Sequence, residues 1–404
     1  MLLNEELLGG GEFEVAVAPP YTKKLNSVAY GGNGDIRYVA VGDEGSIISS
    51  SDGKTWYKRI STTAEDLASV KWITNYNYWL AVGVGSTICY SADGITWGSY
   101  GIYPSAGQTP AGLLNGWSTN KIIQNPYTKD YVYIPRYRGA FRKQASYASV
   151  SDISGWQSIA DYGSSRPLAG ISSISAAAYE DNTDFTLLAG FGPPNFLYSR
   201  DGINFTGLTF SFATGPSDIA TDNAGGVMIV ESRPSGSVKI YTTVASTSAL
   251  DSVAVWNSTN SPRVADFKSQ YDISGTGWTD GLGDPMGSKV KVAYGEYFDD
   301  TTTLQGTWVL VSRYGKIKWS QYPLSLTGSY LIRYYPSVIP KLYTNNGLSW
   351  SDANLPTIDS PVYNAVTYGG GQFIAVGSSG LIVISADGKN WYTKNDNVTK
   401  TCVF

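Results

Sequence analysis

The heptapeptide SADGKNW at 385–391 has three close relatives in this 404-residue chain: SSDGKTW at 50–56, SADGITW at 91–97 and SRDGINF at 199–205. An Asp-Gly pair between two strand-like runs predicts a two-residue type I′ hairpin, which needs positive φ at both central positions. The Asp carboxylate and the Ser hydroxyl can accept backbone N–H bonds within the turn. The aromatic residue that follows can cover the gap to a neighbouring sheet. We therefore interpret the motif as structural rather than catalytic.

The aromatic residue that ends the motif recurs along the chain, after copies that are degenerate in places. Its positions are Trp56, Trp97, Trp156, Phe205, Trp256, Trp350 and Trp391. The steps between them are 41, 59, 49, 51, 94 and 41 residues. A period of about 40 to 50 residues is typical of a propeller or a solenoid. The step of 94 residues indicates one unit with insertions.

Each unit reads as four short strands separated by turn residues. In the last unit the runs are YNAVTYG at 363–369, QFIAVG at 372–377, LIVISA at 381–386 and KNWYTK at 389–394. The second run is the most regular, and it recurs at 37–42, 78–83, 130–135, 185–190, 226–231, 307–312 and 372–377. These runs are almost wholly apolar, which is typical of strands buried on both faces. They give the same count as the aromatic residues.

The expected fold is all-β: a seven-bladed β-propeller of four-stranded antiparallel blades, with eight blades as an alternative. We expect an N-terminal arm at 1–20, a propeller at 21–404, and insertions near 101–127, 257–287 and 320–341. Segment 13–19 or segment 400–404 could each supply a strand that closes the ring.

The composition excludes several classes of function. There is no histidine and there are only two cysteines, which disfavours most hydrolase mechanisms and thiolate metal sites. The net charge is −4, and the sequence has no stripe of basic residues of the kind that nucleic-acid binding requires. No apolar run reaches the roughly 20 residues of a membrane span, and the N-terminus has no basic segment typical of a signal peptide. We expect no cofactor, no nucleic acid and no membrane insertion.

The motif resembles the Asp-box, or bacterial neuraminidase repeat, found between the third and fourth strands of propeller blades in sialidases and many unrelated proteins. The matching residues are Asp52, Asp93, Asp201 and Asp387, with one residue fewer before the Trp than in the common form. Copies at 149–156, 248–256 and 344–350 are degenerate. The resemblance implies the fold and says little about chemistry.

Sialidase activity is not expected. The Arg-Ile-Pro signature of sialidases is absent, and we interpret Arg136 and Arg138, in YIPRYRG at 133–139, as charges at the end of an inner strand. No pair of acids stands out by its spacing. The densest acidic stretch, YFDDTTT at 297–303, reads as a turn, with a calcium site as the alternative. We expect neither an enzyme nor a metal site.

The short form of the repeat looks like that of propellers encoded by tailed bacteriophages. That resemblance implies a non-enzymatic virion protein of the tail, nozzle, fibre or head decoration, present in multiple copies. Such a protein is made in the host cytoplasm without a signal peptide. Its partners would be other virion proteins, contacted through the arm at 1–20, and a glycan or protein of the host surface. Tyr330, Tyr334 and Tyr335, in the aromatic insert at 329–340, are the candidate binding residues.

Two alternatives belong to other classes. The first is an intracellular assembly factor similar to the photosystem II assembly propeller. That resemblance implies a patch of arginines, whereas the arginines of this sequence are scattered. The second is a glycan-binding or degenerate sialidase-like protein.

Overall fold

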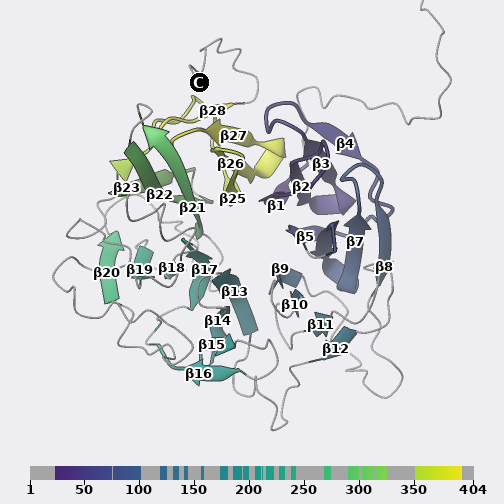
Figure 1. The fold of residues 1–404 in the computed structure, drawn as a ribbon, viewed down its shortest axis with the longest axis horizontal. Coiled ribbons are helices and arrows are strands. Elements are labelled where there is room, and N and C mark those ends of the chain that lie inside the picture. The colour runs from purple at the N-terminus through teal and green to yellow at the C-terminus, as the bar shows by residue number, and fades with distance from the viewer. Residues whose placement is uncertain are drawn as a thin grey trace, which may run out of the picture.

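In the computed structural model, all the long elements among the described residues are β-strands, and they lie around a central axis (Figure 1). The structure describes residues 23–101 except residue 75, and strands and parts of their connections between 119 and 273. It also describes 290–324, apart from 300–302 and 314, and 351–393. The arm at 1–20 and both proposed closing segments lie outside these residues.

The strands pair into seven sheets of four, each built from consecutive strands. The first sheet contains β1 (Leu25–Tyr30), β2 (Tyr38–Gly42), β3 (Ile47–Ser50) and β4 (Tyr57–Arg59). The second contains β5 (Leu67–Ile73), β6 (Tyr78–Gly83), β7 (Thr87–Ser91) and β8 (Gly98–Gly101). The third contains β9 (Thr119–Gln124), β10 (Tyr131–Pro135), β11 (Phe141–Lys143) and β12 (Trp156–Ser158). The fourth contains β13 (Ser173–Glu180), β14 (Phe185–Phe191), β15 (Phe196–Ser199) and β16 (Thr206–Leu208).

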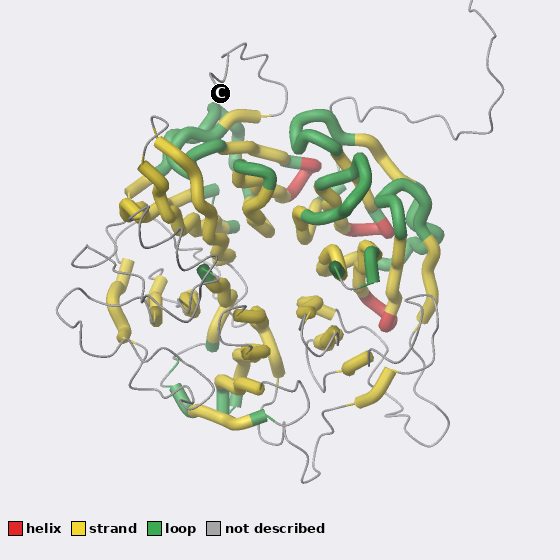
Figure 2. The backbone as a smooth tube through the Cα atoms, in the orientation of Figure 1, coloured by secondary structure: helices red, strands yellow, loops and turns green. Residues whose placement is uncertain are grey.

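The second half of the chain repeats this plan. The fifth sheet contains β17 (Pro216–Thr221), β18 (Val227–Ser232), β19 (Val238–Thr242) and β20 (Lys268–Ile273). The sixth contains β21 (Val290–Asp299), β22 (Thr303–Ser312), β23 (Ile317–Leu324) and β24 (Ser351–Asp352). The seventh contains β25 (Tyr363–Gly369), β26 (Gln372–Gly377), β27 (Ile382–Ser385) and β28 (Tyr392–Thr393). Three short 3-10 turns follow second strands: η1 (Asp43–Gly45), η2 (Val84–Ser86) and η4 (Ser378–Gly380) (Figure 2).

The sheets are arranged like the blades of a propeller. The first strand of each sheet contacts the first strand of the next, and β25 contacts β1, so the contacts run in a closed order. All strand pairs within the sheets are antiparallel. The prediction of an all-β propeller with four-stranded antiparallel blades is therefore confirmed.

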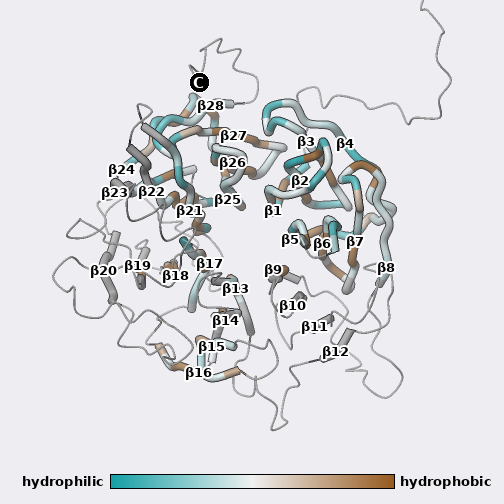
Figure 3. The backbone as a smooth tube through the Cα atoms, in the orientation of Figure 1, coloured by the Kyte–Doolittle hydropathy of each residue, from teal (hydrophilic) through white to brown (hydrophobic). Residues whose placement is uncertain are grey.

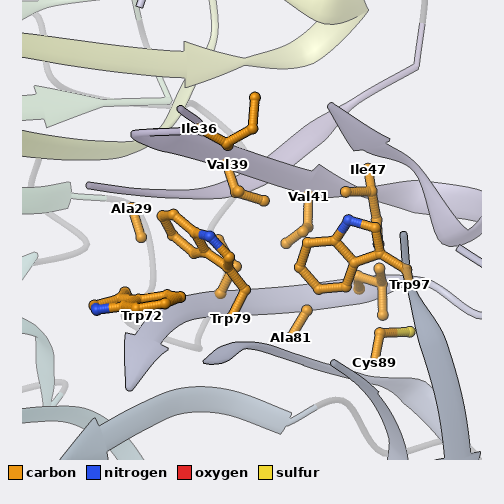
Figure 4. Packing of buried hydrophobic residues seen from close by; sticks show 12 residues of the cluster. Ala29, Ile36, Val39, Val41, Ile47, Trp72, Trp79, Ala81, Cys89 and Trp97 are labelled. Atoms are coloured by element: carbon orange, nitrogen blue, oxygen red, sulfur yellow. The ribbon is translucent and has the colours of Figure 1, made fainter. Parts of the chain in front are cut away.

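The core lies in the seams between sheets. Each of the second strands β2, β6 and β26 ends in a run of five buried residues, because both of its faces are covered by neighbouring sheets. Hydrophobic residues gather on the strands and hydrophilic ones on the connecting loops (Figure 3). At the seam of the first two sheets, Trp79 and Trp97 pack with Val41 and Cys89 (Figure 4).

Most of the first strands carry an extra residue near their start. Register shifts occur between Leu25 and Ser27, Ile174 and Ala176, and Tyr363 and Ala365, for example. The extra residues donate side-chain hydrogen bonds to the next first strand: Asn26 to the carbonyl of Leu67 at 3.0 Å, Ser175 to that of Pro216, and Asn364 to that of Leu25 at 2.8 Å. A bulge thus frees a polar side chain to bind the next sheet.

One expectation about the strand positions is wrong. Trp256 was expected to begin the fourth strand of its unit, but that strand is β20, which starts at Lys268. The copy before Trp256 lacks the Asp-Gly pair that fixes the loop elsewhere, so its aromatic residue does not mark the strand. Part of the insertion expected at 257–287 is therefore blade.

Candidate functional site

The repeated motif forms the loop between the third and fourth strands. Asp52 Oδ1 accepts hydrogen bonds of 2.8 Å from the backbone N–H groups of Lys54 and Thr55, and one of 3.0 Å from the Ser50 hydroxyl. The Ser50 hydroxyl accepts the Gly53 N–H at 2.8 Å. The same bonds recur at 91–96 and 385–390. The carboxylate is therefore committed to its own loop in all three copies.

The electrostatics of the loop agree with this role. Burial alone would raise the pKa of Asp52, but hydrogen bonds from Thr55, Lys54 and Ser50 outweigh it and hold the pKa below its ordinary value. The pKa of Asp93 is lowered in the same way, against burial, by its bonds to Ile95, Thr96 and Ser91. A general acid would need the opposite shift.

The loop is not the two-residue type I′ hairpin predicted above. Gly53 has a φ of 76°, but Asp52 is not among the residues with positive φ. The third strand ends at Ser50 and the fourth begins at Tyr57, so the connection is longer. The Asp side chain caps the backbone, so only the Gly has to adopt the left-handed conformation.

The motif also joins neighbouring blades. Trp56 packs against Ile374 and Val376 of the preceding sheet, and its Nε1 donates to the Gly53 carbonyl at 2.7 Å. A Cβ added at Gly53 would overlap Gln372 and would lie 2.7 Å from Ile374 Cδ1. The aromatic residue therefore covers the seam, as the sequence suggested, and the Gly permits close approach.

The binding residues expected from the sequence cannot be placed. Tyr330, Tyr334 and Tyr335 lie outside the described residues, as do Arg136 and Arg138. In the stretch at 297–303, β21 ends at Asp299 and β22 begins at Thr303, and the residues between them, where the turn is expected, lie outside the described residues. Within the described ranges, no group of three or more Asp, Glu or Cys residues could hold a metal ion. Within the same ranges, no helix has the length and apolar character that a membrane span requires.

A different cluster emerges from the first strands. Four sheets carry an aromatic residue that is paired across the strands with a buried aromatic residue of the second strand. The pairs are Tyr30 with Tyr38, Trp72 with Trp79, Tyr294 with Trp308, and Tyr368 with Phe373. Their ring centroids are 4.7 to 5.3 Å apart. Such pairs stabilise a sheet by roughly 0.5–1.5 kcal/mol beyond their burial.

These four sheets are neighbours in the ring: the sixth, the seventh, the first and the second. We call their first-strand residues Tyr294, Tyr368, Tyr30 and Trp72 the aromatic rim. In the third, fourth and fifth sheets, the residues four positions after the extra residue of the first strand are Gln124, Tyr179 and Thr221. Tyr179 is also aromatic, but it is paired with Thr186, so among the described strands the paired aromatic residues are confined to one sector of the propeller.

Small residues let the rim pack closely. A Cβ at Gly369 would overlap the ring of Tyr30, and one at Gly31 would overlap Trp72. Gly295 faces Tyr368 in the same way. Three of the four rim residues, Tyr30, Trp72 and Tyr368, thus lie on a glycine of the preceding sheet. Tyr30, Tyr294 and Tyr368 remain partly exposed, whereas Trp72 is buried.

The rim carries polar and charged groups. The Arg37 guanidinium lies 5.0 Å from the centroid of Tyr30 and donates to its hydroxyl at 2.7 Å. The Tyr294 hydroxyl donates to Glu296 Oε1 at 3.0 Å, and the Tyr368 hydroxyl donates to the Glu296 carbonyl. The β21–β22 hairpin continues past Tyr294 to Asp299, so its strands extend beyond the aromatic rim.

The rim had a signal in the sequence. VAYGG at 28–32, VAYGE at 292–296 and VTYGG at 366–370 share a Val-x-Tyr-Gly pattern at the end of a first strand. Which glycine an aromatic ring contacts depends on the neighbouring blade, so the sequence of one strand cannot reveal the contact.

Comparisons with known proteins agree on the fold. YCF48 from Cyanidioschyzon merolae is 12% identical at a TM-score of 0.51, with 91% of this chain and 97% of that chain covered. A structure of YCF48 bound to D1 peptide is 12% identical at 0.50, with 93% and 95% covered. The β-propeller domain of Cps50 (Swd1) from Myceliophteria thermophila is 9% identical at 0.53, with 93% and 99% covered.

Sequence identities this low support the fold alone. The sheets of this chain and its likeness to these structures show that it is a β-propeller. No family model and no curated protein matches the sequence.

Proposed function

We propose that this protein is a non-catalytic propeller that binds an extended segment of a partner protein at the aromatic rim, as an assembly factor does. The observation that carries the proposal is that, among the described strands, the paired aromatic residues are restricted to four adjacent blades. A feature needed only for folding would be expected in all blades, since every blade has the same seams to fill.

The chemistry of the rim suits a peptide. Tyrosines present a large, rigid and amphipathic contact area at small entropic cost, and they are enriched in protein interfaces. Three rim tyrosines are partly exposed, and the projecting β21–β22 hairpin adds a wall beside them. The Asp-box loops offer no such surface, because their carboxylates are already bonded.

The comparisons favour this assembly role over the virion role. One similar structure is described as YCF48 bound to D1 peptide, which is a propeller with a protein ligand. The likeness supports a peptide ligand only as an analogy of fold.

The test is selection from a displayed library of random 12-residue peptides. We expect the full chain to enrich a family of peptides, and the double variant Tyr30→Ser, Tyr368→Ser to lose them. The control is Tyr392→Ser, at an exposed tyrosine of the outer strand β28. No enrichment, or equal binding by the rim variant, would contradict the proposal.

A virion role is the second candidate, and it rests on the short form of the repeat. It predicts this chain at stoichiometric copy number in purified phage particles, measured by mass spectrometry. Deletion of 1–20 should then reduce incorporation while the propeller stays folded. Absence from the particles would exclude this role.

Two further features belong to the proposal. The complete ring has seven blades rather than eight, which the closed order of contacts among seven first strands supports. The protein turns over no glycan, and a fluorogenic sialoside assay with a mixed-glycan substrate tests this expectation.

A further inference from the structure

Arg37 is the cation of the aromatic rim, and it is fixed in one orientation. Its Nη2 donates to the Tyr30 hydroxyl and its Nη1 to the Gly32 carbonyl, each at 2.7 Å. Its backbone is held as well, because the Arg37 N–H donates to the Ser50 carbonyl at 3.0 Å and its carbonyl accepts the Gly31 N–H at 2.9 Å. Little entropy would be lost on binding a ligand, since the side chain is already ordered.

Arg37 has no acidic ion-pair partner in the part of the chain that the structure describes. Among the residues that the structure describes, no carboxylate lies within ion-pair distance of its guanidinium, although the whole chain carries a net charge of −4. The ion pairs elsewhere use other cations, such as Lys318 with Asp352 at 2.8 Å. A guanidinium has five N–H groups, and the two bonds named above leave three of them for a ligand.

The geometry points to Arg37 as the anchor for a carboxylate of the bound segment. We infer that the segment carries an acidic group beside an aromatic or apolar residue. The carboxylate accepts hydrogen bonds from the free N–H groups at the edge of the guanidinium, and the neighbouring side chain packs on the rim tyrosines. This inference rests on the proposed function, because it names the chemistry of the peptide bound at that site. The group is either an acidic side chain or a C-terminal carboxylate.

The experiment uses the same peptide selection with the full chain and Arg37→Gln. Peptides enriched by the native protein should carry Asp, Glu or a free C-terminus at one position, and Arg37→Gln should bind them at least about 5-fold more weakly. That loss corresponds to one partly exposed charge-assisted hydrogen bond. Arg37→Lys should lose part of the affinity, because lysine keeps the charge but not the planar fork.

Arg313→Gln is the matched control. Arg313 is also partly exposed, but it lies in the β22–β23 connection, at the opposite end of the axis. Synthetic peptides with the acid changed to its amide, or with the C-terminus amidated, show which carboxylate binds.

The outcomes separate the two claims. Enriched peptides without a common carboxylate, or full binding by Arg37→Gln, would overturn the inference while the peptide-binding function stands. No enriched peptide at all would overturn the function itself. Circular dichroism of Arg37→Gln shows whether the variant is folded. If it is not, the amide peptides still decide, because they test the carboxylate on the native protein.

Discussion

The side-chain amide of Asn364 donates a hydrogen bond of 2.8 Å to the backbone carbonyl of Leu25, 339 residues earlier in the chain. It joins the last blade to the first. The same seam holds the Tyr38 hydroxyl bonded to the Gly369 carbonyl at 2.8 Å, and Gln372 bonded to the Asp52 carbonyl at 2.7 Å. Within the described residues the ring therefore closes through side chains and first-strand contacts, since the first and last sheets each consist of consecutive strands.

Asn364→Ala should lower the free energy of unfolding by about 1–2 kcal/mol, because it leaves a buried carbonyl without its donor. Urea denaturation of the full chain measures the change. Asn33→Ala, at an exposed loop position, is the control and should stay within about 0.5 kcal/mol of the native value. Equal stability of the two variants would mean that the bond does not contribute to closure.

A glycine series can separate backbone strain from seam packing. Gly371 has a φ of 78° with no atom near its added Cβ, so Gly371→Ala should cost about 1–2 kcal/mol through strain alone. Gly53→Ala carries the same strain and also meets Ile374 and Gln372, so we expect about 1–3 kcal/mol more.

Gly34→Ala is the reference for this series, because Gly34 has neither a positive φ nor a close neighbour. It should be neutral in the same urea titration. If Gly53→Ala costs no more than Gly371→Ala, the motif does not lock the seam.

The carboxylates of the loops between third and fourth strands should make stability depend on acid pH. Burial opposes ionisation of Asp52 and Asp93, but their hydrogen bonds win and lower both pKa values below the ordinary 3.8. A lowered folded-state pKa contributes stability that is present above about pH 4 and is lost as the pH falls through the folded value. Urea midpoints between pH 2 and pH 7 should therefore fall more steeply for the native protein than for Asp52→Asn, Asp93→Asn.

The control for this pH profile is Asp35→Asn, at an exposed aspartate. Its profile should follow that of the native protein. Parallel profiles for all three proteins would contradict the assignment of the acid-sensitive stability to the loops.

The Cys89 thiol should be inert in the folded protein. It is buried in the seam between the first two sheets, and burial raises its pKa to about 12. At pH 8 a thiol reagent should label a Cys402→Ser variant only as fast as the protein opens, and urea should expose the site. Rapid labelling without urea would show that this seam is open.

The sequence predicted the strands well, and the reason is local. All seven expected second strands coincide with a second strand of a sheet, because runs such as QFIAVG at 372–377 are buried on both faces and bounded by glycine. The structural role of the motif was also predicted, since its bonds join residues at most three apart. The turn type of the motif was not predicted, because the Asp52 side chain accepts hydrogen bonds from backbone N–H groups of the loop.

The candidate site was not predicted, since it is made between blades. Tyr30 and Arg37 lie seven residues apart, but the glycine beneath Tyr30 is Gly369. No pattern along one blade shows which residue of its neighbour it will contact. The fourth strand β20 was missed for another reason, because the motif that marks fourth strands elsewhere is lost before Trp256.

The most direct test of the peptide-binding account is hydrogen–deuterium exchange of the full chain with and without a selected peptide. The account predicts slower exchange in segments 30–38, 292–298 and 366–373, which carry the three rim tyrosines and Arg37. Protection confined to the turns at 43–45, 84–86 and 378–380, at the opposite end of the axis, would contradict it.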